Sequence, residues 1–166
     1  MKRRLLIALA AVFLASGCAT TAPSYGPAGS ETAPWRGRLA VRIEADPNAA
    51  ESQSFSAAFE LSGSAPAGAL TLFTPIGTTA AALSWTPLTA VLKTNGDTQS
   101  FATLDALIKQ VIGTEIPVAA LFAWLAGENM NAAGWIADLS RQTDGRITAR
   151  RLTPAPAAEL RLVLDQ

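Results

Sequence analysis

Few residues of this chain could carry out chemistry. Among its 166 residues there is one cysteine, Cys18, and no histidine. Histidine is the commonest general base and transition-metal ligand, and a cysteine thiolate is a frequent nucleophile or zinc ligand. We therefore expect no metal site and no cofactor. A single thiol cannot close a disulfide within the chain, and in an exported protein it needs a specific explanation.

Carboxylates are the remaining catalytic candidates. Asp97, Asp105 and Glu115 would be the residues of interest if the chain were a hydrolase. Each lies in the context of a turn or a helix start, where solvated and capping roles are the usual explanation. We therefore expect that the chain is not an enzyme. A hydrolase is kept as an alternative hypothesis.

Cys18 ends a segment that has the features of a secretory signal. Residues 2–4 are basic, residues 5–15 are apolar, and Ser16-Gly17 is a small-residue junction. A permanent transmembrane helix needs about 20 apolar residues, so residues 1–17 are predicted to direct export and to be removed. Ser16-Gly17-Cys18 resembles the lipobox of bacterial lipoproteins, which implies that Cys18 is acylated. The alternative is an ordinary signal peptide with a chance cysteine.

The composition after residue 17 limits the possible partners. The signal holds three of the 13 basic residues and none of the 13 acidic ones, so 10 basic and 13 acidic residues remain. This balance argues against a nucleic-acid partner, which would need a concentrated basic face. Residues 18–34 are small, polar and rich in Pro and Gly, and are interpreted as a flexible tether. One domain is expected over residues 35–166.

Most of this domain has a period of two, which is typical of antiparallel strands. Asn95-Gly96 is a strong signal for a two-residue hairpin turn. The expected inward residues are Leu39, Val41, Ile43, Phe55, Ala57, Phe59, Leu61, Leu70, Leu72, Ala81, Leu83, Trp85, Leu88, Ala90 and Leu92.

The period changes to that of a helix in the middle of the domain. Apolar residues follow helical spacing over residues 104–111, where Thr103 can cap the start and Gly113 the end. Pro117 suits the first turn of a second helix, which Gly127 would close. Period two returns over residues 135–140, 146–152 and 160–164. The expected fold is mainly β: one curved sheet or open antiparallel barrel, covered by two short helices.

Several strands are expected to carry small residues on one face, namely Ala57, Ala58, Ala80, Ala81, Ala82 and Ala90. Such a face could leave room for an apolar ligand, or it could accommodate the helices. The pattern alone does not separate these two alternatives.

The order of motifs resembles the LolB family of outer-membrane lipoprotein receptors. The matching stretches are Trp35-Arg36-Gly37-Arg38-Leu39-Ala40-Val41, Phe59-Glu60-Leu61-Ser62-Gly63, Leu72-Phe73-Thr74-Pro75-Ile76-Gly77-Thr78-Thr79, Ile112-Gly113-Thr114-Glu115-Ile116-Pro117-Val118, then Leu121, Trp124-Leu125, Gly127 and Gly134-Trp135.

The resemblance implies an unclosed antiparallel barrel, covered by helices, that encloses an apolar cavity for acyl chains. It also implies a monomer at the outer membrane that faces the periplasm. There it would take lipoproteins from a soluble LolA-like carrier and insert them into the membrane lipid. In the family, a loop between two strands carries Pro, Leu and Gly, and its Leu protrudes to act in insertion. Here Pro75, Ile76 and Gly77 occupy these places, and the alternative is that Ile76 packs into the core.

Apolar residues of the strands and helices are the candidates for the acyl-chain cavity. The tryptophans are expected to be structural rather than ligand contacts. The candidate lining residues are Leu39, Val41, Phe55, Phe59, Leu70, Leu72, Leu83, Trp85, Leu107, Val111, Leu121, Phe122 and Leu125.

The second hypothesis is a structural adaptor lipoprotein of an envelope complex. Such a protein would use the sheet edge or its outer face and would have a filled interior. A lipid-binding assay separates this reading from lipoprotein transfer.

Overall fold

A computed structural model describes residues 33–45 and 51–165 of the chain. Cys18, the signal segment 1–17 and nearly all of the tether 18–34 lie outside the described residues. The expectations that fall on them therefore remain predictions.

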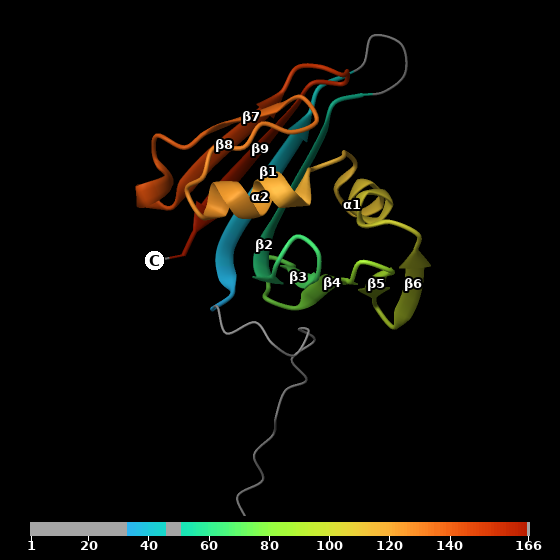
Figure 1. The fold of residues 1–166 in the computed structure, drawn as a ribbon. Helices are drawn as coiled ribbons and strands as arrows, with labels where there is room; N and C mark the ends of the chain where they lie inside the picture. Colours follow the sequence, from blue (N-terminus) through green and yellow to red (C-terminus); the bar gives the residue numbers. More distant parts are fainter. Residues whose placement is uncertain (1–32, 46–50, 166) are drawn as a thin grey trace, which may run out of the picture.

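The structure is one open antiparallel sheet with two helices on one side of it (Figure 1). The strands pair in the order β6-β5-β4-β3-β2-β1-β9-β8-β7. The strand bounds are β1 Trp35–Ile43, β2 Gln53–Gly63, β3 Gly68–Phe73, β4 Thr79–Trp85, β5 Ala90–Thr94, β6 Asp97–Phe101, β7 Trp135–Asp138, β8 Arg146–Arg151 and β9 Ala158–Leu164.

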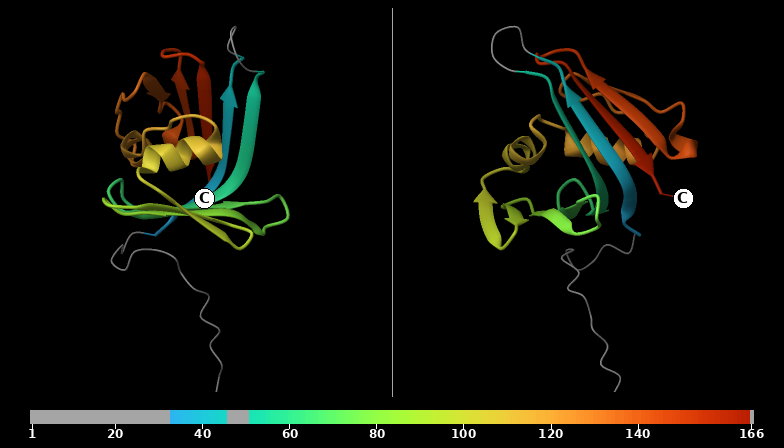
Figure 2. Two further views of the ribbon diagram at one scale, coloured as in Figure 1. Left: turned by 90° about the vertical axis from the view of Figure 1, so that its right-hand side faces the viewer. Right: turned by 180° about the vertical axis from the view of Figure 1, so that it is seen from behind.

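The helices come between β6 and β7 in the chain and cover the concave face of the sheet. They are α1 (Leu104–Ile112) and α2 (Val118–Leu125), and a short 3-10 turn (Gln142–Asp144) precedes β8. Figure 2 shows β1 and β2 rising together while β3 to β6 turn across their lower end, which leaves the helices inside the curve. The expected order, with strands first, then two helices and then three further strands, is confirmed, as is the open sheet.

The hairpin turn and the helix-capping residues lie where the sequence predicts them. Asn95 and Gly96 join β5 to β6 with positive φ angles of 39° and 93°, as a primed hairpin turn requires. The Thr103 hydroxyl accepts from the Ala106 N–H at the start of α1, and Gly113 ends this helix at a φ of 88°. In α2, Pro117 is the capping residue and the helix ends at Leu125, before Gly127.

Two expectations about the strands are wrong. Leu88 is not an inward strand residue, because β5 begins at Ala90 and Leu88 is 87% exposed in the turn after Pro87. A proline cannot donate to a sheet ladder, and the Thr86 hydroxyl accepts from the backbone N–H groups of Leu88 and Thr89.

The small residues do not share one face either. Ala81 and Ala90 are buried in the core and Ala57 packs against it. Ala58 and Ala82 alternate with these inward positions, so they face outward, and Ala80 is exposed beside an irregularity in the β3–β4 pairing.

Candidate functional site

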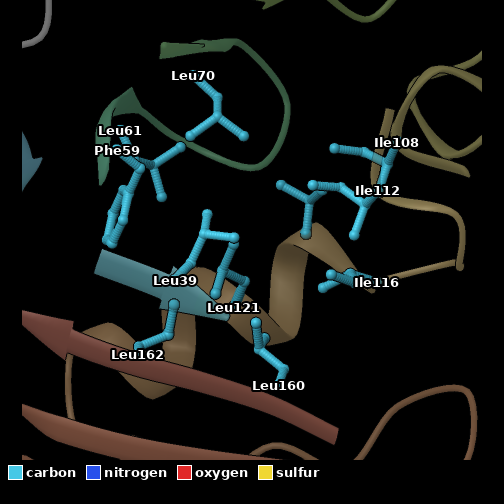
Figure 3. A pocket seen from close by; sticks show the side chains of 11 residues that line it. Leu39, Phe59, Leu61, Leu70, Ile108, Ile112, Ile116, Leu121, Leu160 and Leu162 are labelled. Carbon is cyan, nitrogen blue, oxygen red and sulfur yellow. The ribbon is translucent and has the colours of Figure 1, made fainter. Parts of the chain in front are cut away.

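An apolar cavity of about 40 Å³ lies between the concave face of the sheet and the helical segment (Figure 3). Four strands and both helices contribute to it, and Phe59 is its only aromatic lining residue among those described. The lining side chains are those of Leu39, Phe59, Leu61, Leu70, Ile108, Ile112, Ile116, Val118, Leu121, Leu160 and Leu162.

The predicted cavity residues divide into a lining group and a surrounding group. Leu39, Phe59, Leu70 and Leu121 line the cavity. The others pack in the core beside it: Val41, Leu72, Leu83, Trp85, Leu107 and Leu125 are buried, and Phe55, Val111 and Phe122 are partly buried.

Seven lining residues lie outside the predicted set. Leu160 and Leu162 alternate along β9, which pairs with β1 and so brings the end of the chain beside its first strand. Ile108 and Ile112 are one helical turn apart on α1 and point toward the cavity (Figure 3). Period two could have found Leu61, Leu160 and Leu162, and helical spacing could have found Ile108 and Ile112; the remaining residues are Ile116 and Val118.

The size and chemistry of the cavity set limits on what it can hold. None of the lining side chains carries a polar atom, so a water molecule inside would find no side-chain partner. A cavity that holds even one benzene molecule has about 150 Å³, well above the 40 Å³ found here. The described cavity is therefore too small for an acyl chain, which would enter only if the lining elements moved apart.

Polar contacts hold the connection between α1 and α2 against the sheet. The buried Arg151 guanidinium on β8 donates to the Thr114 hydroxyl at 2.9 Å and to the Pro156 carbonyl at 3.1 Å. The Trp135 indole N–H donates to the Glu115 carbonyl at 3.0 Å, and the Arg151 guanidinium lies over the Trp135 ring. These contacts fasten the interhelical segment to one side of the sheet.

The buried tryptophans do not line the cavity. Each directs its indole N–H to backbone carbonyls: Trp85 to Ser64 and Ala65, Trp124 to Met130, and Trp135 to Glu115. Buried indole groups usually need such a partner. These three residues therefore fasten turns and connections to the core.

The turn between β3 and β4 displays Ile76, whose side chain is 86% exposed. The Gly77 N–H donates to the Thr74 carbonyl at 2.9 Å, and the hydroxyls of Thr74 and Thr78 are 2.8 Å apart. Pro75 has a fixed φ that suits the turn, and Gly77 has a φ of 83°, which glycine adopts without strain. Ile76 therefore does not pack into the core, and a short, internally bonded turn holds it out.

The three candidate carboxylates do not form a common site. Asp97 begins β6, Asp105 lies in the first turn of α1, and Glu115 follows α1; all three are exposed. A hydrogen bond and an ion pair at 2.9 Å from Lys109 hold the pKa of Glu115 below its ordinary value. Within the described residues, no three Asp, Glu, His or Cys side chains are placed to bind a metal, and no helix is long and apolar enough to span a membrane.

Comparison with known proteins agrees with this architecture. A family model described as "Outer membrane lipoprotein LolB" matches residues 34–155. The chain is also 30% identical over 153 residues to a protein of Cupriavidus pinatubonensis (strain JMP 134 / LMG 1197) named outer-membrane lipoprotein LolB, covering 88% of this chain and 70% of that protein. This chain therefore belongs to the LolB family of outer-membrane lipoproteins.

Proposed function

We propose that this protein accepts lipoproteins from a soluble periplasmic carrier and inserts them into the outer membrane, without catalysing a reaction. In this proposal Cys18 is the acylated anchor of the mature chain and the folded domain faces the periplasm. The observation that carries the proposal is the apolar cavity between the sheet and the helices, together with an exposed Ile76 on an internally hydrogen-bonded turn.

Burial of the cargo's acyl chains supplies the free energy for uptake in this proposal. Each methylene removed from water contributes about 0.8 kcal/mol. A receptor that shields more methylenes than the carrier receives the cargo without nucleotide hydrolysis, because only the difference in affinity counts. The membrane shields the chains better still, so the transfer runs in one direction.

The small size of the cavity adds a step to this account. In this proposal the helices move away from the sheet before an acyl chain enters. The acyl chain then occupies the space that the apolar side chains fill at rest. The hydrogen bond from the Arg151 guanidinium to the Thr114 hydroxyl lies at the segment between the helices. Opening is therefore expected to involve α1, α2 or both, while the strands stay paired.

Displacement of an apolar dye tests the proposed binding. A dye that fluoresces in apolar surroundings should bind the chain, and a purified acylated lipoprotein should compete with it. The same lipoprotein without its acyl chains is the matched control and should not compete. A chain that binds neither dye nor lipoprotein at any concentration would contradict the proposal.

The second candidate function is a structural adaptor of an envelope complex. The small volume of the cavity favours it, because an adaptor needs a filled interior rather than a ligand space. In that case the outer face or an edge strand would bind a partner protein, and neither dye nor lipoprotein would bind inside.

A further inference from the structure

The convex face of the sheet, on the side away from the helices, carries most of the arginines of the chain. Outward positions on β1, β8 and β9 include Arg36, Arg38, Arg42, Arg146, Arg150 and Arg161. They are six of the ten basic residues that follow residue 17. We refer to these six residues as the arginine face.

The charge of the arginine face is opposite to that of the chain as a whole. The outward carboxylates of β2, β7 and β9 are three: Glu60, Asp138 and Glu159. The strands of this face therefore have a positive balance, although acidic residues outnumber basic ones after residue 17. Glu44 and Asp165 lie at its margins, just beyond β1 and β9.

Half of the arginine face is not neutralised by ion pairs. Arg36 pairs with Glu60 at 2.7 Å, and Arg150 and Arg161 share Glu159 at 2.6 Å each. In the part of the chain that the structure describes, Arg38, Arg42 and Arg146 have no carboxylate within ion-pair distance. These three side chains are available to an external anion.

The strand pairing places two of these arginines in line with the exposed turn of Ile76. One row of paired residues crosses the convex face in the order Phe73, Ala58, Arg38, Val163 and Arg146. The turn that displays Ile76 begins directly after Phe73. Figure 2 (left) shows this turn, drawn in green, projecting on the side of the sheet away from the helices.

Exposed apolar side chains are interspersed among the arginines. Val163 lies between Arg38 and Arg146 in the same row, and Ile136 pairs with Arg150 across β7 and β8. The exposed fractions of Val163 and Ile136 are 47% and 64%, and Leu152, which directly follows β8, is 74% exposed. Basic side chains among exposed apolar ones are the combination that binds the headgroup layer of an anionic membrane.

A shallow depression of about 320 Å³ on this face offers space for a headgroup. Four arginines border it, namely Arg141, Arg146, Arg150 and Arg161, together with the hydroxyl-bearing Ser140 and Thr148. Asp138 also borders it, but its side chain accepts a hydrogen bond from the Ser140 backbone N–H at 3.0 Å. Guanidinium and hydroxyl groups are the usual partners of a phosphate.

We propose that the arginine face binds the surface of an anionic phospholipid membrane and orients the domain so that Ile76 meets the same surface. The inference rests on the proposed function, because that function places the domain at a membrane and gives Ile76 its role. Its new content is that electrostatic recognition by the convex face selects an anionic bilayer. The helical side and the cavity then remain accessible to the carrier.

Vesicle co-sedimentation tests this inference directly. The chain from residue 18 onward, with Cys18→Ser to remove the anchor, retains every described residue. It should bind vesicles of equal parts phosphatidylcholine and phosphatidylglycerol, should bind phosphatidylcholine alone much more weakly, and should be released by high salt. Arg38→Gln with Arg146→Gln should lower the partition coefficient about twenty-five-fold, since each basic residue near an anionic surface contributes roughly fivefold.

The matched control removes one charge on the helical side of the sheet. Lys109→Gln changes the net charge as much as the single variant Arg38→Gln but leaves the arginine face intact, so partitioning should fall by much less. Equal binding to both vesicle types, or equal loss in Lys109→Gln and Arg38→Gln, would overturn the inference. So would binding to an acidic protein or to a second copy of the chain in place of vesicles.

A lipoprotein transfer assay on the same variants separates the two proposals. A chain that delivers lipoprotein equally well to both vesicle types contradicts only the role of the arginine face. A chain that binds anionic vesicles through Arg38 and Arg146 but never accepts lipoprotein contradicts only the proposed function.

Discussion

The Arg151 guanidinium on β8 donates to the Thr114 hydroxyl between the two helices at 2.9 Å, and both residues are buried. Thr114→Val keeps the shape of the side chain but removes one of the two acceptors of this buried cation, the other being the Pro156 carbonyl. Loss of a hydrogen bond to a buried polar or charged group costs about 1–3 kcal/mol. We therefore expect the variant to lower the free energy of unfolding by that amount.

Denaturant unfolding of Thr114→Val and of a control variant, Thr71→Val, checks this prediction. Thr71 is half-buried on β3, so the control should change the free energy of unfolding by no more than about 0.5 kcal/mol. Equal stability of Thr114→Val and wild type would show that the contact does not hold the helical segment.

Ile76→Glu should fold normally, since the side chain is exposed and surface changes usually cost within about 0.5 kcal/mol. It should still accept cargo but should fail to release it into liposomes, because a carboxylate resists entry into the apolar layer. Ile76→Leu should behave as wild type. A two-stage assay of uptake and release, together with a thermal melt, measures each step.

Leu88→Glu is the matched control for this variant. Leu88 is as exposed as Ile76 and also lies in a turn between strands. The Leu88→Glu variant should deliver cargo normally. A failure of both variants would mean that any exposed acidic substitution blocks release, and normal delivery by Ile76→Glu would exclude the insertion role.

Val118→Ile adds one methylene at the lining of the cavity, where about 40 Å³ is free. Filling a cavity commonly stabilises a protein by about 0.5–2 kcal/mol, so the melting temperature should rise while affinity for the apolar dye falls. Val41→Ile is the contrast, because Val41 is buried outside the lining and overpacking there should cost about 1–3 kcal/mol. A lower stability of Val118→Ile would show that the space is not available.

The pH dependence of stability should carry a contribution from Glu159. Hydrogen bonding from Arg150, supported by Arg161, holds the pKa of this carboxyl below its ordinary value of 4.5. A carboxyl group with a depressed pKa stabilises the folded state at pH values above its ordinary pKa. This contribution is lost as the pH falls through the folded-state pKa.

Glu159→Gln should therefore reduce the loss of stability on acidification below about pH 4.5. Denaturation midpoints over this range measure the effect. Glu128→Gln, an exposed change outside the sheet, is the control. Identical profiles for Glu159→Gln and wild type would contradict the assigned role of the ion pairs.

Cys18→Ser should abolish acylation and leave either uncleaved precursor or soluble protein. The single cysteine at a small-residue junction motivates this prediction. Intact-mass measurement of the wild-type chain should show the mass of the attached lipid on a chain that begins at Cys18. A wild-type chain with an unmodified thiol would rule out this reading.

The elements of the fold could be predicted where local rules govern them. Asn95-Gly96 requires positive φ angles for its turn, and Thr103 and Gly113 cap α1 through their own backbone and side-chain chemistry. Leu88 was not predictable in this way, because it continues the alternation of Ala90 and Leu92 although Pro87 keeps it in a turn.

The lining of the cavity was only partly predictable because it depends on contacts between distant parts of the chain. Leu160 and Leu162 reach the cavity because β9 pairs with β1, and Leu72 and Leu83 miss it although their alternation looks the same. The arginine face has the same origin: Arg38 and Arg146 become neighbours only through Val163 on β9.

Transfer of one acylated lipoprotein through this chain tests the central claim most directly. The carrier loaded with a labelled lipoprotein is mixed with the Cys18→Ser chain, the two proteins are separated, and the chain is then given liposomes. We predict that the label moves first to the chain and then to the liposomes, and that the chain binds no non-acylated form of the same protein. A label that stays with the carrier, or that moves to liposomes equally fast without the chain, would contradict the account.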